Sequence, residues 1–340
     1  MLKIKSFGIV DRIYDWIEDW LKDRQQRVVI LGKNSKWIKV KSGVPQGSVL
    51  GPLLFLIYIN DIDDCVGTHI LKFADDTKIY SVVANQEDVA KLQDDLKNLC
   101  YWSREWLMLF NIAKCKVMHL GRNNVKAEYE IDGTKLDEVD EERDLGVIMQ
   151  KDLKCNQQCS RAVKTANRVL GMIKRTFTYL NKENMLLLYK SLVRPHLEYS
   201  VQAWRPHYRK DIDLIEKVQR RATKLIPQLK DKSYEERLLF LDLTTLETRR
   251  LRGDLIEVFK IFKGYDDLKP SKFFNLNTNL TRGHSLKLFK GRFNLDCRKF
   301  VFSQRVIDVW NSLDEEIIAC DSLNGFKNRI DKFLKGRGFI

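Results

Sequence analysis

The chain has 340 residues, of which 60 are Lys or Arg and 46 are Asp or Glu, so its formal net charge is +14. Hydrophobic residues make up 44% of it, enough for a buried core, and no apolar run approaches the roughly 18 residues of a membrane span. The N-terminus lacks the apolar segment of a secretory signal, and the seven cysteines show no framework spacing. Composition therefore predicts an intracellular protein, nuclear or cytoplasmic, with reduced thiols and no membrane partner.

Charge is unevenly distributed along the chain. Residues 1–150 hold 21 Lys and Arg against 24 Asp and Glu, residues 151–230 hold 18 against 6, and residues 231–340 hold 21 against 16. A nearly neutral first part followed by a basic block favours carboxylate chemistry in the former and polyanion binding in the latter. A solvated basic helical face explains the same block without a ligand, so charge alone leaves both interpretations open.

The first part of the chain mixes helical and strand patterns. Apolar residues at helical spacing predict helices around residues 13–21 and 89–99. A glycine- and proline-punctuated turn at 43–51 runs into an apolar stretch at 52–59. Runs rich in β-formers predict strands, and a hairpin turn at 32–35 is expected between the first two. The predicted strands are residues 27–31, 37–41, 70–74, 78–83, 116–120, 129–131 and 145–149.

Helical periodicity replaces the strand signal after about residue 155. At about 100° per residue, apolar residues between Ala162 and Phe177 share one helical face, as do those between Leu214 and Ile226. The opposite faces are basic and predict contacts to a nucleic-acid backbone, made by Arg161, Lys164, Arg168, Lys217, Arg220 and Arg221. The polar segment 278–291 predicts a flexible linker, and two helices at 302–313 and 326–334 end the chain.

The pair Asp75-Asp76 lies between two predicted strands, in the sequence Phe73-Ala74-Asp75-Asp76. Adjacent carboxylates repel each other, so a turn selected only for its shape favours Asn-Gly or Asp-Gly. A divalent metal ion removes this repulsion, and oxygen ligands suit Mg²⁺. Taken alone, however, such a pair is more often a solvated turn.

A second motif precedes this pair and changes its interpretation: residues 42–55 read SGVPQGSVLGPLLF. A glycine-rich loop that runs into a helix lets the backbone approach a nucleotide or template strand closely. With Tyr58-Ile59-Asn60-Asp61 and the Asp-Asp hairpin, this run resembles the reverse transcriptases of non-long-terminal-repeat, jockey-like retrotransposons. Further matches to this family cover essentially the whole chain, at residues 111–114, 115–121, 144–147, 193–199 and 310–313.

The resemblance implies RNA-directed DNA polymerisation, in which deoxynucleotides are added to a DNA primer on an RNA template with Mg²⁺. Asp75 and Asp76 are then the catalytic carboxylates that hold the metal, and Lys114 protonates the leaving pyrophosphate. Contacts to the template and the incoming nucleotide are implied for Pro45, Gln46, Gly47 and Ala74.

The expected fold class is α+β, with three parts. Residues 1–125 are predicted to form a partial polymerase palm, a small antiparallel sheet with helices. Residues 126–277 are predicted to form a helical, basic thumb and connection, and residues 278–340 a C-terminal helical region.

The resemblance leaves one gap, because the palm strand that carries another metal-binding aspartate in this family has no counterpart here. The acids upstream of the glycine-rich motif stand at the helical spacing of a solvated face; they are Asp11, Asp15, Asp19 and Asp23. We therefore expect a truncated copy with little or no activity alone, and a second chain is a possible source of the missing palm and fingers. Two alternatives stay open: a nucleic-acid-binding remnant without catalysis, and a decayed gene product without a stable fold.

Overall fold

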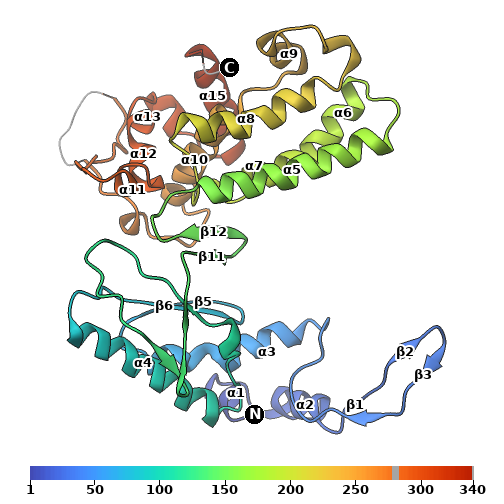
Figure 1. The fold of residues 1–340 in the computed structure, drawn as a ribbon, viewed down its shortest axis with the longest axis vertical. Coiled ribbons are helices and arrows are strands. Elements are labelled where there is room, and N and C mark those ends of the chain that lie inside the picture. The colour runs from blue at the N-terminus through green and yellow to red at the C-terminus, as the bar shows by residue number, and fades with distance from the viewer. Residues whose placement is uncertain (278–282, 339–340) are drawn as a thin grey trace. The chain divides into compact units, whose positions relative to one another are not determined.

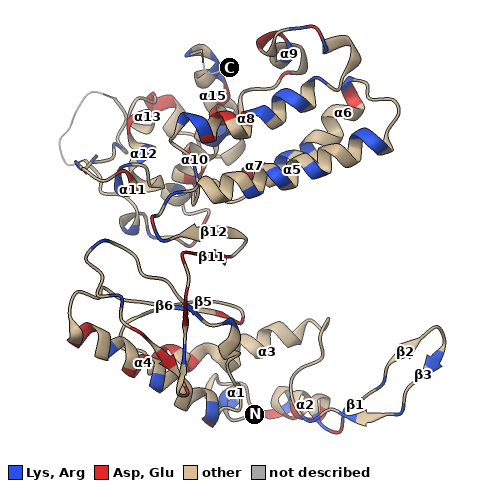
Figure 2. Ribbon diagram, in the orientation of Figure 1, with Lys and Arg blue, Asp and Glu red and all other residues tan. Residues whose placement is uncertain are grey.

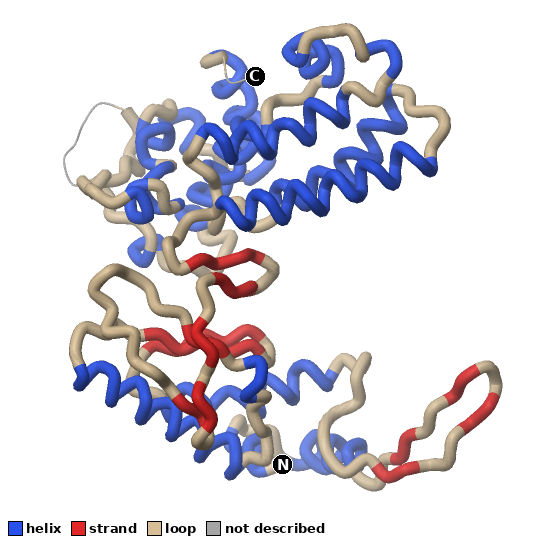
Figure 3. Tube along the Cα trace, viewed as in Figure 1, coloured by secondary structure: helices blue, strands red, loops and turns tan. Residues whose placement is uncertain are grey.

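The computed structural model describes residues 1–277 and 283–338. The chain has two compact units, residues 1–139 and 140–340 (Figure 1). Helices make up most of the regular structure, and every strand of the described residues belongs to a two-stranded sheet (Figure 3). The α+β fold class expected from the sequence is confirmed. Among the described residues, none of the helices combines the length and the apolar character that crossing a lipid bilayer requires.

The first unit begins with two helices and a β-ribbon. α1 (Leu2–Ser6) is short, and α2 (Asp11–Leu21) confirms the first predicted helix. The ribbon consists of two antiparallel pairs, β1–β4 and β2–β3, with strands at Gln25–Gln26, Val29–Ile30, Lys33–Asn34 and Ile38–Lys39. Its turn is Leu31-Gly32, at φ 48° and 77°, and not the predicted segment 32–35. A two-residue turn with both residues in the left-handed conformation matches the twist of the strands that it joins. Lys33 therefore already belongs to the second strand, where it pairs with Ile30.

The middle of the first unit is a helix, a hairpin and a second, longer helix. The elements are α3 (Leu50–Ile59), the 3₁₀ helix η1 (Asn60–Cys65), β5 (His69–Phe73), β6 (Asp76–Tyr80) and α4 (Gln86–Glu105). Thus the apolar stretch after the glycine-rich loop is a helix, and the predicted hairpin and helix around it are confirmed. Ile70 and Ile79 of the hairpin pack toward Leu99 and Trp102 of α4, whereas the other hairpin face is exposed.

The segment after α4 folds back onto that helix. Its elements are η2 (Ile112–Lys114), β7 (Lys116–Val117), β8 (Glu130–Ile131), β9 (Thr134–Lys135) and β10 (Asp137–Glu138). Tyr129, Ile131 and Leu136 are buried against Leu96 and Cys100 of α4. Because of this packing, the first unit extends to residue 139, beyond the boundary expected after residue 125.

The second unit is mainly helical. A hairpin, β11 (Glu141–Asp144) with β12 (Val147–Gln150), precedes α5 (Asn156–Thr176). The elements that follow are α6 (Lys182–Leu188), the π-helix η3 (Tyr189–Val193), α7 (Arg194–Glu198), α8 (Arg209–Thr223), η4 (Pro227–Leu229), α9 (Tyr234–Leu241), α10 (Leu246–Lys263), η5 (Pro270–Lys272), α11 (Asp296–Lys299), α12 (Phe302–Arg305), α13 (Ile307–Asn311), α14 (Glu315–Ile318) and α15 (Leu323–Gly336).

The first core of this unit lies where α5 packs on α7 and α8. Ala166, Leu170 and Ile173 of α5 are at most 2% exposed, which confirms the predicted apolar face. Phe177, assigned to the same face from its spacing, is exposed instead because the helix ends at Thr176. The basic residues of α5 consequently point to solvent.

A second core joins α10 to the C-terminal helices, with Phe259, Trp310 and Phe326 among its fully buried residues. It contains residues on both sides of the boundary expected at 277/278. Residues 278–282 of the predicted linker lie outside the described residues. The rest of that linker is not loose: the His284 ring nitrogen Nε2 lies 2.9 Å from the Trp310 carbonyl oxygen, and Leu288 is 1% exposed. Its polar composition misled the prediction because the apolar partners are distant in sequence.

Candidate active site

The carboxylate pair sits at the tip of the β5–β6 hairpin. Phe73 pairs with Asp76, so Ala74 and Asp75 alone form the turn. Ala74 has φ 52°, a left-handed conformation that costs an alanine about 1 kcal/mol or more. Asp75 and Asp76 are both exposed, and their side chains form no hydrogen bond or ion pair with another described residue. The hairpin tip therefore presents one carboxylate from the turn, Asp75, and one from the first residue of β6, Asp76, and the oxygens of both are available to a ligand.

A half-buried lysine next to the turn ties the hairpin to the chain before it. Lys72 on β5 forms an ion pair with Asp63 at 2.9 Å, and its ammonium also donates to the backbone oxygen of Asn60 at 3.0 Å. The Lys72 side chain is only 17% exposed. These bonds satisfy carbonyls at the end of α3 and fix the hairpin against η1.

Lys3 provides a second fixed point, which the sequence did not reveal. Its ammonium donates to Asp61 Oδ1 at 2.6 Å and to the Tyr58 carbonyl oxygen at 2.7 Å. It also lies 4.7 Å from the centre of the Trp102 ring and 3.7 Å from that of Trp106. Asp61 accepts a further bond from Trp102 Nε1 at 3.0 Å. This arrangement joins α1, α3 and α4 beneath the hairpin, and burial together with Asp61 raises the pKa of Tyr58.

The glycine-rich loop is a compact turn leading into α3. Ser48 Oγ donates to the Pro45 carbonyl at 2.7 Å and accepts from the Gly51 amide at 3.0 Å. Gly47 has φ 84°, and a Cβ on Gly51 would lie 3.0 Å from the Pro45 oxygen. Gln46 and Gly47 are exposed and Pro45 is half-buried. Both glycines are thus required by the backbone, and the loop leaves Gln46 open to a ligand.

The remaining predicted catalytic residue, Lys114, ends the 3₁₀ turn η2 and is exposed. No hydrogen bond or ion pair among the described residues links it, or the glycine-rich loop, to Asp75 and Asp76. Across residues 1–277 and 283–338, no group of three or more His, Cys, Asp or Glu is arranged to hold a metal ion. The structure therefore places the neighbouring residues Asp75 and Asp76 at the hairpin tip, and in the described part of the chain they belong to no metal-holding group of three or more such side chains.

The predicted basic surface lies on α5 and α8, which pack against each other in the second unit (Figure 2). Its six cations are all exposed, namely Arg161, Lys164, Arg168, Lys217, Arg220 and Arg221. Two of them also make internal contacts: Arg220 lies 4.2 Å from the Tyr234 ring centre, and Arg221 donates to Asn167 at 2.9 Å. The other four have only solvent around their charges among the described residues, so they are the better candidates for phosphate contacts.

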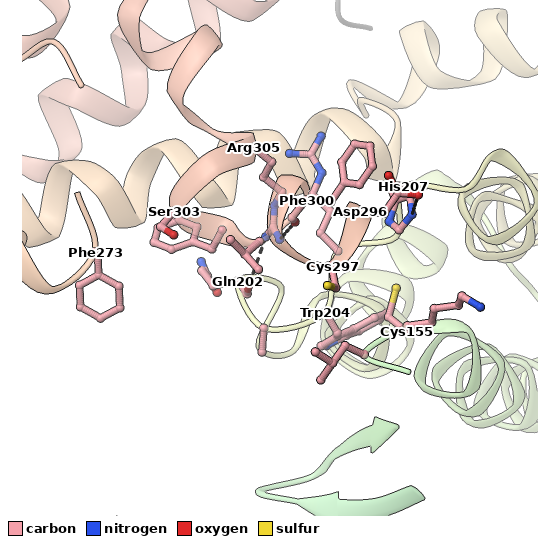
Figure 4. Close-up of a pocket in the computed structure, with 16 residues that line it drawn as sticks. Cys155, Gln202, Trp204, His207, Phe273, Asp296, Cys297, Phe300, Ser303 and Arg305 are labelled. Atoms are coloured by element: carbon pink, nitrogen blue, oxygen red, sulfur yellow. Dashed lines mark hydrogen bonds and ion pairs between the residues drawn. The ribbon is translucent and has the colours of Figure 1, made fainter. Parts of the chain in front are cut away.

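A separate cavity of about 420 Å³ opens in the second unit, between the start of α5 and α11–α12 (Figure 4). Trp204, His207, Phe300 and Arg305 are among its lining residues, and none of the predicted site residues is. The His207 ring stacks on Phe300 at 4.1 Å, and burial lowers the pKa of His207. Arg305 is held by Asp254 through two bonds of 2.9 Å. The residues that line the cavity are thus engaged in contacts that hold the second unit together.

Two downstream motifs that carried the family resemblance contact each other. The Tyr199 hydroxyl donates to the Leu145 carbonyl at 2.9 Å, and its ring would lie 3.3 Å from a Cβ on Gly146. Gly146 also has φ 87°, so two independent constraints require glycine there. These motif residues thus hold the β11–β12 turn against the end of α7.

Comparison with known proteins agrees with these motifs. The family profile described as "Reverse transcriptase (RNA-dependent DNA polymerase)" matches residues 1–180. The chain is 26% identical over 232 residues to the probable RNA-directed DNA polymerase from transposon BS of Drosophila melanogaster, which covers 63% of this chain and 25% of that protein. It is also 26% identical over 220 residues to the RNA-directed DNA polymerase from mobile element jockey of Drosophila funebris, covering 60% and 24%.

A shorter segment matches the retrovirus-related Pol polyprotein from type-1 retrotransposable element R2 of Popillia japonica, 27% identical over 125 residues, or 33% of this chain and 20% of that protein. The chain spans about a quarter of the length of the curated relatives that it matches.

Proposed function

This chain belongs to the reverse transcriptase family, with jockey-like relatives, and on that premise we propose that it takes part in RNA-directed DNA polymerisation. In this proposal an RNA template, a DNA primer and deoxynucleotides are its partners. The observation that carries it is the hairpin tip, where Asp75 of the turn and Asp76 at the start of β6 are both exposed and have no partner among the described residues. Water screens the repulsion between two exposed carboxylates, and a bound divalent cation would remove it.

Reverse transcriptases generally use divalent metal ions, and we propose Mg²⁺ held by Asp75 and Asp76. These residues fit the ion in part, since Mg²⁺ is often bound by one or two carboxylates together with waters and substrate phosphates. When bound, the ion would neutralise charge on the transferred phosphate. The chain itself contributes the tight turn at the left-handed Ala74, which brings Asp75 and Asp76 to the tip of the hairpin.

The remaining predicted residues take supporting roles in this proposal. Exposed Gln46 and Gly47, with Pro45, would contact the template and the nucleotide, and Ala74 would line the same space. Lys114 would donate a proton to pyrophosphate, and its exposed ammonium is free to reach a ligand. The basic surface of α5 and α8 would hold the nucleic-acid backbone.

We further propose that residues 1–340 alone have little polymerase activity. Two-metal phosphoryl transfer needs carboxylates on both ions, and among the described residues only two acids meet at the hairpin. A second polypeptide that supplies another carboxylate would complete the site. The chain's own sheet β5–β6 offers unpaired strand edges for such a partner.

Primer extension on an RNA template with Mg²⁺ tests the proposal, with and without an added palm-and-fingers fragment from a jockey relative. Incorporation is expected only with the fragment, and the substitutions Asp75→Asn and Asp76→Asn should abolish it. Asp94→Asn, at an exposed position on α4, is the matched control that removes one charge elsewhere. Incorporation that survives both hairpin substitutions would refute the carboxylate assignment.

A non-catalytic, nucleic-acid-binding function is the second candidate, and the exposed cations of α5 and α8 favour it. It predicts that RNA affinity depends on Arg161, Lys164 and Arg168 and is unchanged by Asp75→Asn. A sample without any cooperative thermal transition would instead support the decayed gene product.

A further inference from the structure

The β1–β4/β2–β3 ribbon, residues 24–41 (hereafter the basic ribbon), extends from α2 as a two-stranded arm (Figure 1). Every residue from Gln25 to Lys39 is exposed, on both faces of the ribbon. An isolated two-stranded hairpin is at best marginally stable in water, and this one buries no side chain of its own. The arm therefore needs a partner that covers it.

The charge of the basic ribbon identifies the class of partner. It carries six cations, and the sequence from Arg24 to Asn60 contains no Asp or Glu. Two of the cations have internal contacts: Arg24 donates to backbone oxygens, and Arg27 lies 4.6 Å from the Trp37 ring centre. Lys33, Lys36 and Lys39 have no ion pair or hydrogen bond from their ammonium groups to any described residue. Three cations without partners along the returning strand fit a polyanion.

The tip of the ribbon adds an apolar contact. Leu31 is 100% exposed and adopts φ 48°, so the chain holds a leucine in a strained turn and projects it into solvent. At about 3.3 Å per residue, the strand from Gln25 to Leu31 spans roughly 20 Å. That length exceeds the roughly 12 Å width of the major groove of B-DNA, so the arm is long compared with the groove of a nucleic-acid duplex.

The aromatic content of the ribbon favours a duplex over a single strand. Single strands are held by stacking bases on open aromatic rings. Trp37 is the one aromatic residue of this segment, and the Arg27 guanidinium covers a face of its ring. A hybrid of RNA and DNA has an A-like shallow minor groove that displays sugars and backbone. Such a surface suits an arm whose lysines stand beside exposed apolar side chains, among them Val28, Ile30, Leu31 and Ile38.

We propose that the basic ribbon binds the RNA–DNA hybrid duplex, with Lys33, Lys36 and Lys39 on its phosphates and Leu31 against its minor groove. The inference rests on the proposed function, because it takes the hybrid from that reaction. It adds a nucleic-acid contact in the first unit that is distinct from the basic surface of α5 and α8.

Fluorescence anisotropy of a labelled RNA–DNA hybrid, titrated with the full chain at several NaCl concentrations, tests this proposal. Each phosphate contact contributes close to 0.9 to the slope of log affinity against log salt for duplex DNA. The triple variant K33A/K36A/K39A should therefore lower the slope by about 2 to 3. The matched control K91A/K97A/K135A removes the same charge from exposed positions in the first unit and should leave the slope nearly unchanged.

A second variant separates the apolar tip from the charges. Leu31→Asn places at the turn a residue that tolerates its left-handed conformation. It should weaken hybrid binding roughly ten- to a hundredfold, as the loss of one buried leucine predicts, without changing the salt slope. Since the ribbon buries no core residue, thermal unfolding of both variants should match that of the wild type.

Equal slopes for the ribbon and control variants would overturn the inference. If R161A/K164A/R168A abolishes binding and the ribbon variant does not weaken it, the proposed function stands and the ribbon assignment fails. Absence of salt-dependent hybrid binding by the wild type would overturn both. Ribbon-dependent binding to phosphatidylserine vesicles, without an effect on the hybrid, would assign the arm to a membrane surface and likewise refute the proposal.

Discussion

The substitution Lys3→Met is expected to destabilise the first unit by about 2 kcal/mol. The Lys3 ammonium donates to Asp61 and to the Tyr58 carbonyl, and lies over the rings of Trp102 and Trp106. Methionine retains an unbranched side chain that can fill the same space between the rings. The substitution therefore isolates the contribution of the charge from that of packing.

The magnitude follows from the partners. A hydrogen bond to a charged group contributes about 1.5–3 kcal/mol net, and the cation–π contacts add up to about 2 kcal/mol. Two effects reduce the loss. Removing Lys3 also removes the cost of burying an ammonium, and Asp61, 38% exposed, stays solvated and keeps its bond from Trp102. The net effect is accordingly smaller than the sum of the contacts.

The amide hydrogen exchange rates of α1 and α4 report the free energy of local unfolding in the first unit, so they measure this destabilisation. A cycle of Lys3→Met, Asp61→Asn and the double variant should give a coupling energy of about 1–2 kcal/mol. A coupling energy below about 0.5 kcal/mol would refute the reasoning, because it would mean that Lys3 contributes only through packing.

Three further outcomes are expected for the second unit. Asp254→Ala should cost about 3–5 kcal/mol, measured by urea denaturation, because it leaves buried arginines without their carboxylate; a loss under 1 kcal/mol would contradict this. Burial lowers the pKa of both His207 and His284, so the unfolded chain binds protons at a higher pH than the folded chain does. The free energy of unfolding should therefore fall by up to about 1.4 kcal/mol per histidine per pH unit as the pH drops below about 6.5. Replacing both histidines with Gln should flatten that pH dependence. Cys297, the exposed thiol, should react with a thiol reagent before any other cysteine in the folded chain; peptide mapping of the first adduct decides this.

The spacing of apolar residues along the sequence predicted the helices and strands that bury one face. The 3.6-residue period located α5, and the two β-rich runs located the β5–β6 hairpin with its carboxylates at the tip. These predictions succeeded because each depends on residues close together in sequence.

Features that depend on distant partners escaped prediction. Nothing in residues 1–6 indicates that Lys3 meets Trp102 and Trp106, since contacts between remote segments leave no local period. The linker assigned to residues 278–291 failed for the same reason, because His284 and Leu288 are buried by residues of the C-terminal helices. The roles of Asp75, Asp76 and Lys114 in catalysis stay predictions.

The division of the chain into units with their own hydrophobic cores has an evolutionary consequence. The carboxylate hairpin depends on the core of residues 1–139, and the cations of α5 and α8 depend on that of residues 140–340. Mutations that erode one core leave the packing of the other intact. Under the proposed function, a lineage of related chains can therefore lose catalysis while selection still preserves nucleic-acid binding. The ratio of accepted substitutions in the two units would record which property was kept.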